Sequence, residues 1–351
     1  MRSRHIVARL SCAVFAVIAS ARHLSAQKGI AAAAAQRHGI RLEDADMTAV
    51  ERGDVIVRVL PTLDQRDVAV FGVVRLAVSR DMYLRRVQDF RNWLHTPTRT
   101  AFGLFSDPAV AADVDNVIVS RDDARDLRNC RAGDCTTKLP AAEMQRVQGE
   151  VDWSANDVQA RVTALARQRM VQYVGDYREH GNASMPMYED RPSVRASDAF
   201  AALLAQSSYL NQAVPGVASY FRTFPRGRPA GISDVLYWSE EAVARLRPIL
   251  SITHAVVYTP PEVAGTTVVA SKQIYANHYF EAALEVMDLT DRDVTGDPAS
   301  TYLIVERRFR FDNLPKGGIL NIRGRAVNGL RDQLRDDLLR EKAAAERPTS
   351  R

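Results

Sequence analysis

The sequence predicts an α+β protein: a curved antiparallel sheet that grips a long C-terminal helix, with a helical insertion between the first strands and the last ones. Segments rich in β-branched and aromatic residues, which favour strands, gather in the C-terminal part of the chain at 234–240, 249–258, 267–280 and 301–311. A charged segment from about Asn321 to Lys342 then repeats leucine every three or four residues. That spacing is typical of an amphipathic helix with one buried side.

Two strands and a helix are predicted near the N-terminus. Residues 54–60 and 67–78 are rich in valine and other strand-favouring residues. Ser79 follows directly, and after it apolar residues recur at helical spacing, namely Tyr83, Val87, Phe90 and Leu94. Serine is a preferred helix N-cap, so we expect a helix to begin where the second strand ends.

The remaining segments complete the predicted organisation. Residues 27–50 are alanine-rich and form an N-terminal arm, either as a short helix or as a frayed end. We expect one domain at 51–342, with the helical insertion at about 102–231 and a disordered tail at 343–351. Within the insertion, residues 95–140 look irregular, and helices are expected after Trp153 and at 196–205.

Composition excludes one broad class of function. Of the 351 residues, 46% are apolar and 25% are charged, as in ordinary globular proteins. The formal net charge is +5, but residues 1–26 hold four arginines and no acidic residue. The rest of the chain has 43 basic and 42 acidic residues, a net charge of +1. Nucleic-acid binding requires a concentrated basic surplus, so we expect no nucleic acid as a partner.

The first 26 residues resemble a secretory signal peptide. Arg2, Arg4 and Arg9 precede an apolar run at 10–21, and small residues suited to cleavage follow, ending at Ala21 or Ala26. The run is too short to span a bilayer, which takes about 20 residues. The alternative is a buried N-terminal helix. We expect export to the periplasm or secretion, with no transmembrane segment in the mature chain.

Removal of the signal peptide would take Cys12 with it and leave two cysteines, in Cys130-Arg-Ala-Gly-Asp-Cys135. In an oxidising compartment two nearby thiols usually form a disulfide, and the intervening Gly133 permits the tight turn that this requires. A zinc site needs three or four ligands and no histidine lies near, while a catalytic dithiol is more often Cys-x-x-Cys. We predict a structural disulfide between Cys130 and Cys135.

The order of elements resembles the START-like superfamily, the helix-grip fold of lipid-transfer domains and polyketide cyclases. One feature is the segment Val73-Val-Arg-Leu-Ala-Val-Ser79-Arg-Asp-Met-Tyr-Leu, similar to the first strand of that fold running into its first helix. The other is the final hairpin, with Gly317-Gly318 leading into the helix near 321–341. The resemblance implies a container for a hydrophobic molecule such as a lipid, a sterol or an aromatic compound.

Residues on the predicted strands suggest how such a container would hold its ligand. His254 and Tyr258 lie on the same, apolar side of one predicted strand, and Lys272, His278 and Phe280 share one side of the next. Small-molecule sites combine apolar walls with a few convergent polar groups. Aromatic residues would add to the walls, and the candidates here are Trp238 and Tyr275. The alternatives are histidines satisfied by core hydrogen bonds and aromatic residues that fill the core.

Arg307 interrupts the apolar side of the last predicted strand. A charge on an inward side is costly unless it is paired, so Arg307 should face a carboxylate, a ligand anion or water. The alternative is a β-bulge that turns this side chain outward.

Known catalytic patterns are missing from the sequence. It contains no nucleophile elbow, phosphate-binding loop, zinc-protease motif or dinucleotide fingerprint, and we expect no cofactor and no metal. The leading hypothesis is an exported protein that binds a hydrophobic small molecule without transforming it, with transient membrane contact allowed. The alternatives are a cyclase- or hydrolase-like enzyme using His254 or His278, and an envelope interaction module with a filled core.

Overall fold

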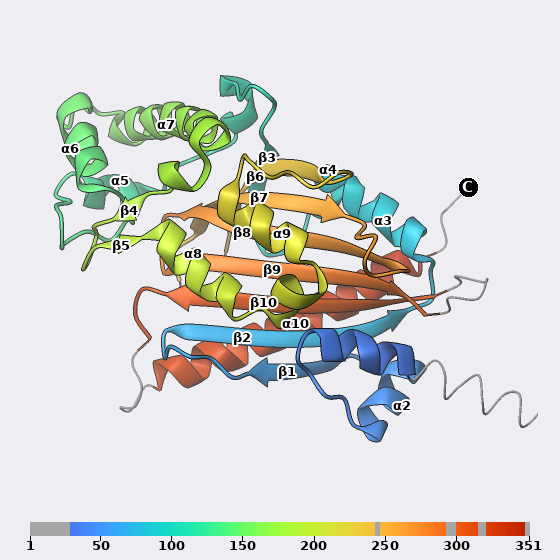
Figure 1. Ribbon diagram of the computed structural model, residues 1–351. Coiled ribbons are helices and arrows are strands. Elements are labelled where there is room, and N and C mark those ends of the chain that lie inside the picture. The colour runs from blue at the N-terminus through green and yellow to red at the C-terminus, as the bar shows by residue number, and fades with distance from the viewer. Residues whose placement is uncertain (1–28, 243–245, 293–299, 315–320, 348–351) are drawn as a thin grey trace, which may run out of the picture.

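The computed structural model describes residues 29–242, 246–292, 300–314 and 321–347. Their main feature is an open antiparallel sheet of eight strands in the order β1-β2-β10-β9-β8-β7-β6-β3, which confirms the predicted α+β class (Figure 1). The strands are β1 (Ile56–Leu60), β2 (Asp67–Leu76), β3 (Arg99–Leu104), β6 (Ser233–Glu241), β7 (Ile249–Tyr258), β8 (Thr266–Ala276), β9 (Phe280–Asp291) and β10 (Thr301–Phe311). A separate two-stranded hairpin joins β4 (Met187–Tyr188) to β5 (Val194–Arg195).

Helices cover both faces of this sheet. The helices of the chain include α2 (Asp44–Arg52), α3 (Arg80–Gln88), α4 (Phe90–Trp93), α5 (Arg121–Leu127), α6 (Ala141–Glu150), α7 (Val158–His180), α8 (Ala196–Ala205), α9 (Pro215–Thr223) and α10 (Ile322–Ala345). Residues 29–37 form a further helix in the N-terminal arm. Shorter turns are the 3₁₀ segments Ala111–Val114 and Gly181–Ser184 and the π-helical segment Tyr209–Ala213.

The C-terminal helix α10 packs across β2 and β1 on one face, and in Figure 1 it lies behind the strands. Leu334 and Leu338 are its buried residues. They sit over Gly72 of β2, where an added Cβ would come within 2.5 Å of a Leu338 methyl carbon. Glycine at this position therefore lets the helix approach the sheet backbone closely.

The opposite face, which we call the covered face, lies under α8, α9, the second half of α7 and the N-terminal arm. In Figure 1 α8 and α9 lie in front of the central strands. Strand alternation sends Leu236, Ile252, Val256 and Ile274 to this face, where they join buried aromatic residues of the helices. The arm adds Ala31, Ala34 and Ala35, all fully buried, beside β2 and β10.

The insertion also forms a small lobe of its own at one end of the sheet. Helices α5 and α6 and the first turns of α7 bury an apolar cluster that includes Cys130. Cys130 and Cys135 form a disulfide with Cα atoms 4.7 Å apart, as predicted. The pair closes a short loop, and Gly133 in that loop adopts a positive φ of 82°.

Sequence and structure differ at three places in the sheet. The predicted strand 267–280 is not continuous, because residues 277–279 form the turn between β8 and β9 and Tyr279 takes a φ of +60°. Strand β3 was not predicted, since its segment lies within the stretch 95–140 that looks irregular. Strand β9 was not predicted beyond Phe280, since no strand was assigned to residues 281–300. In the arm, the structure has the short helix rather than a frayed end.

The N-cap at Ser79 is confirmed, since its side chain accepts a hydrogen bond from the Met82 backbone N–H at 3.2 Å. Three expectations fall on residues outside the described ranges: the signal peptide at 1–26, the Gly317-Gly318 entry into the last helix, and the end of the tail at 348–351. Helix α10 itself continues three residues beyond Lys342, to Ala345.

The contact between α10 and the sheet gives a first prediction. Gly72→Ala should lower the free energy of unfolding by about 1–3 kcal/mol, because the new methyl group overlaps Leu338. The matched control is Gly175→Ala in the middle of α7, where an added Cβ meets nothing within 4 Å. That variant should gain about 0.5–1 kcal/mol from lower backbone entropy in the unfolded chain. Urea unfolding measures both, and a Gly72→Ala variant as stable as the wild type would contradict the account.

Candidate functional site

A group of buried polar side chains lies in the covered face, surrounded by aromatic rings. Strand register explains how the sequence brings them together. Lys272 of β8 pairs directly with His254 of β7, and Leu236 of β6 pairs with His254 on the other side. Asp234, two residues before Leu236, therefore points to the same face as His254. We call Asp234, His254, Lys272 and the helix residues that contact them the central cluster.

His254 is satisfied at both ring nitrogens. Its Nε2 lies 2.8 Å from Asp234 Oδ1, and its Nδ1 lies 3.0 Å from the hydroxyl of Tyr177 on α7. Burial lowers the pKa of His254, and the positive charge of Lys272 adds to that effect against the opposing influence of Asp234. A neutral ring fits the geometry, with Nε2–H donating to the carboxylate and Nδ1 accepting from the tyrosine.

Asp234 links this chain of hydrogen bonds to the surface. Its second oxygen, Oδ2, lies 3.0 Å from the Arg228 guanidinium and accepts a hydrogen bond from the Tyr220 hydroxyl at 3.2 Å. Burial raises the pKa of Asp234, but the hydrogen bond and charge of His254 together with Arg228 outweigh it, so the net shift is downward. The carboxylate is therefore ionised and fully paired.

Lys272 differs from its neighbours in having only neutral partners among the described residues. Its side chain is fully buried. The ammonium donates to Asn182 Oδ1 and, at 3.3 Å, to the backbone carbonyl of Phe221. It also lies over the rings of Tyr177 and Phe200, 5.3 and 5.0 Å from their centroids. Burial lowers the pKa of Lys272 to about 7.

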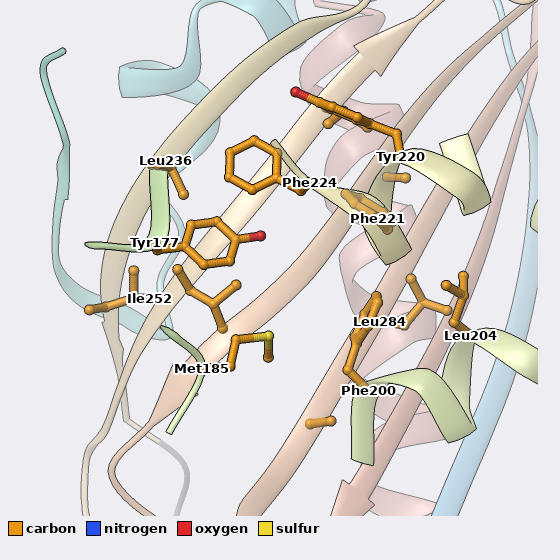
Figure 2. Packing of buried hydrophobic residues seen from close by; sticks show 14 of the residues in the cluster. Tyr177, Met185, Phe200, Leu204, Tyr220, Phe221, Phe224, Leu236, Ile252 and Leu284 are labelled. Carbon is orange, nitrogen blue, oxygen red and sulfur yellow. The ribbon is translucent and has the colours of Figure 1, made fainter. Parts of the chain in front are cut away.

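Aromatic rings from the helices enclose these polar groups. Tyr177 stacks on Phe224 at a centroid distance of 4.8 Å, and Phe224 lies 4.5 Å from the His254 ring. Phe221 and Phe200 meet edge to face at 5.8 Å. Figure 2 shows Tyr177 and Phe224 on one side of the packing and Phe221 and Phe200 on the other, with Met185 below. The surroundings of the central cluster are thus almost wholly apolar.

His278 belongs to a different group of residues. Its Nδ1 lies 2.9 Å from the Thr136 carbonyl and its Nε2 lies 3.1 Å from Asp123 of α5, which also pairs with Arg247. The prediction that His278 shares a strand side with Lys272 is wrong, because residue 278 lies in the β8–β9 turn. The two histidines share no partner, and each has protein partners at both ring nitrogens.

The other candidate residues are dispersed. Trp238 is buried on β6, where its Nε1 donates to the Asp113 carbonyl at 2.8 Å. Tyr258 lies in the apolar cluster of the covered face, and Tyr275 packs against its margin. Phe280 contacts Phe309 and Phe311 instead, with centroids 5.3 and 4.8 Å away.

Arg307 faces carboxylates, one of the three partners expected for it. Its guanidinium pairs with Glu285 of β9 and with Asp337 of α10. Burial lowers the pKa of Arg307, but the two carboxylates reverse the effect and raise it. This pair lies on the α10 face, away from Lys272, and the register shift in β10 falls between Arg310 and Phe311 rather than at Arg307.

A second buried ionic group was missed. His38, at the end of the arm helix, is buried with its Nδ1 2.9 Å from Glu306 and its Nε2 3.5 Å from Asp288. Its ring stacks on Tyr209 at 4.1 Å. Burial lowers the pKa of His38, but the two carboxylates outweigh it and raise the pKa overall. The only signal in the sequence was an acidic residue on each of two apolar strands.

No family model matches this chain, and neither does any curated protein or solved structure. Within the described ranges, no helix is both long and apolar enough to cross a membrane.

The His38 group gives a pH-dependent prediction. His38→Leu should cost about 2–3 kcal/mol of unfolding free energy at pH 6, because it removes a cation shared by two buried carboxylates, which keep only Arg37 and Arg308 as charged partners. A raised pKa contributes stability that is complete below the unfolded value near 6.5 and is lost as pH rises through the folded value. The difference from the wild type should therefore shrink at pH 9.

Urea unfolding at both pH values measures this difference. The control is His180→Leu, because His180 is an exposed residue at the end of α7, and its effect should stay within about 0.5 kcal/mol. An equal loss for His38→Leu at pH 6 and pH 9 would show that the charge of His38 plays no part.

Proposed function

We propose that this protein is an exported carrier that binds a hydrophobic small molecule between the sheet and helices α7, α8 and α9. The observation that carries the proposal is the central cluster itself, a few polar groups held inside a region of aromatic and aliphatic side chains. Ligand sites usually combine apolar walls with a small number of placed polar groups. The sequence signal for export and the disulfide in the small lobe support the exported location.

The resemblance to START-like proteins supports the same proposal. Strand β2 ends at Leu76 and α3 begins at Arg80 with Ser79 as its cap, which is the feature on which the resemblance first rested. A long C-terminal helix on an antiparallel sheet is the other. In this chain, however, α10 contacts the face opposite the central cluster, so the proposed ligand is enclosed by the insertion rather than by α10.

Binding at this place requires the helical cover to move. Tyr177 stacks on Phe224, and both rings and that of Phe221 lie against His254, so a ligand must displace rings rather than enter between them. The apolar contacts that the rings lose are then replaced by apolar contacts with the ligand. Removing apolar surface from water returns about 25 cal/mol per Å², which is enough for useful affinity with a lipid-sized molecule.

The two alternatives differ in what they need from the structure. An enzyme using His254 as general base requires a free ring nitrogen near the substrate, and both nitrogens of His254 are held by Asp234 and Tyr177. An interaction module with a filled core predicts no uptake of small hydrophobic molecules. The ligand experiment therefore separates it from the carrier.

The test is uptake of N-phenyl-1-naphthylamine, an uncharged hydrophobic fluorophore, by mature protein stripped of bound lipid, with native mass spectrometry for stoichiometry. We expect one molecule per chain at micromolar concentration. Phe221→Leu should change the dissociation constant at least about threefold, since one lost ring contact is worth about 1 kcal/mol. Phe280→Leu, outside the central cluster, should leave it unchanged. Absence of uptake by the wild type would reject the carrier.

A further inference from the structure

We propose that the ligand is a hydrophobic monocarboxylic acid, of the long-chain fatty acid class, and that Lys272 binds its carboxylate. This inference rests on the proposed carrier function and adds the chemistry of the ligand to it. The observation behind it is the set of partners around a buried ammonium. An ammonium has three N–H donors, and Lys272 is given two neutral oxygens and two ring faces.

The other lysine that is buried within the described ranges, Lys138, shows the difference. Lys138 is as deeply buried as Lys272, and its ammonium also lies over a ring, that of Tyr188, at 4.7 Å. Lys138 nevertheless has two carboxylates nearby, Asp190 at 3.5 Å and Asp312 at 3.8 Å. A buried charge is normally paired in this way. Among the described contacts of Lys272 there is no carboxylate.

The remaining charges of the central cluster do not fill that role. Asp234 is already shared by His254, Tyr220 and Arg228 and makes no described contact with Lys272. A single ammonium buried among apolar side chains is compensated by a single negative charge. A phosphate headgroup needs several donors, and Lys272 is the only cation fully buried in this cluster. A single carboxylate on an apolar tail satisfies both conditions.

Contacts of Lys272 also link ligand binding to the helical cover. Asn182 lies in the turn after α7, and the Phe221 carbonyl belongs to α9. A carboxylate at Nζ would take the place of one or both oxygens. The ammonium would then release the turn after α7 and the end of α9, which it now holds against β8. An entering ligand requires this movement of the helices.

Proton linkage gives the proposal a pH signature. The lowered pKa of Lys272, about 7, means that the amine is largely neutral at pH 9 in the ligand-free protein. A bound carboxylate favours the ammonium and raises this pKa. Carboxylate affinity should therefore fall by about tenfold per pH unit above pH 7, up to the pKa of the complex. The two titratable groups that face Lys272 do not change charge between pH 7 and pH 9. Burial raises the pKa of Tyr177, so its hydroxyl stays protonated, and burial lowers the pKa of His254, so its ring is already neutral.

The experiment compares oleate with methyl oleate on the delipidated mature protein at pH 7, by competition against N-phenyl-1-naphthylamine. The wild type should bind oleate at least about tenfold more tightly than methyl oleate, a preference that decreases by pH 9. Lys272→Met should bind the two equally, because methionine keeps the apolar volume and removes the charge. Lys138→Met is the matched control and should retain the preference of the wild type.

The outcomes distinguish this inference from the carrier proposal. Equal binding of oleate and its ester by the wild type overturns the role of Lys272 while the carrier stands. Binding of neither oleate nor its ester by protein that still takes up N-phenyl-1-naphthylamine also overturns the inference alone, whereas failure to take up N-phenyl-1-naphthylamine rejects the carrier as well. A preference for oleate that survives in Lys272→Met places the carboxylate elsewhere and also overturns the inference. Should Lys272→Met not fold, Lys272→Arg and the pH dependence of the wild type serve instead. Lys272→Arg and the wild type must then both prefer oleate to methyl oleate at pH 7, and the wild type must lose this preference as the pH rises above 7.

Discussion

Burial of the sheet on both faces is the constraint from which the other features follow. Ionisable residues on its central strands cannot reach water, so the protein must supply their partners. The arm brings His38 to Asp288 and Glu306, α10 brings Asp337 to Arg307, and α7 brings Tyr177 to His254. Each of these three elements thus carries a polar group that matches one on the sheet. Lys272 is the position where the described structure supplies only neutral groups.

This pattern distinguishes polar residues that hold the fold together from one that is available for a ligand. Histidines with both nitrogens occupied, and arginines between carboxylates, already make the contacts that their chemistry allows. Removing a partner from such a group is costly, whereas adding a partner to Lys272 completes it. For this reason the ammonium, rather than either histidine, is the group to which we assign the carboxylate of the proposed ligand. The rings around it provide the apolar surface that a carrier needs.

Much of the architecture could be predicted from the sequence. Runs of β-branched residues located β1, β2, β6, β7 and β10, and the spacing of leucines located α10. Strand alternation placed His254 among the apolar residues of its strand, but only the register of β7 and β8 shows that Lys272 lies on the same face. The turn at 277–279 could not be predicted, because Asn277, His278 and Tyr279 continue the apparent alternation and only a positive φ at Tyr279 interrupts it. The His38 group was missed because His38 lies more than 200 residues from both of its acidic partners in the chain.

The central claim is that Lys272 is an ammonium without a carboxylate in an apolar site, and its titration tests this directly. Selective isotope labelling of lysine side chains, with Lys272→Met to assign the signal, would follow the Nζ resonance of the ligand-free protein against pH. The account predicts a midpoint near 7, raised when oleate is added. A midpoint at or above the ordinary lysine value of 10.5 would show that Nζ is solvated or already paired, and would contradict the account.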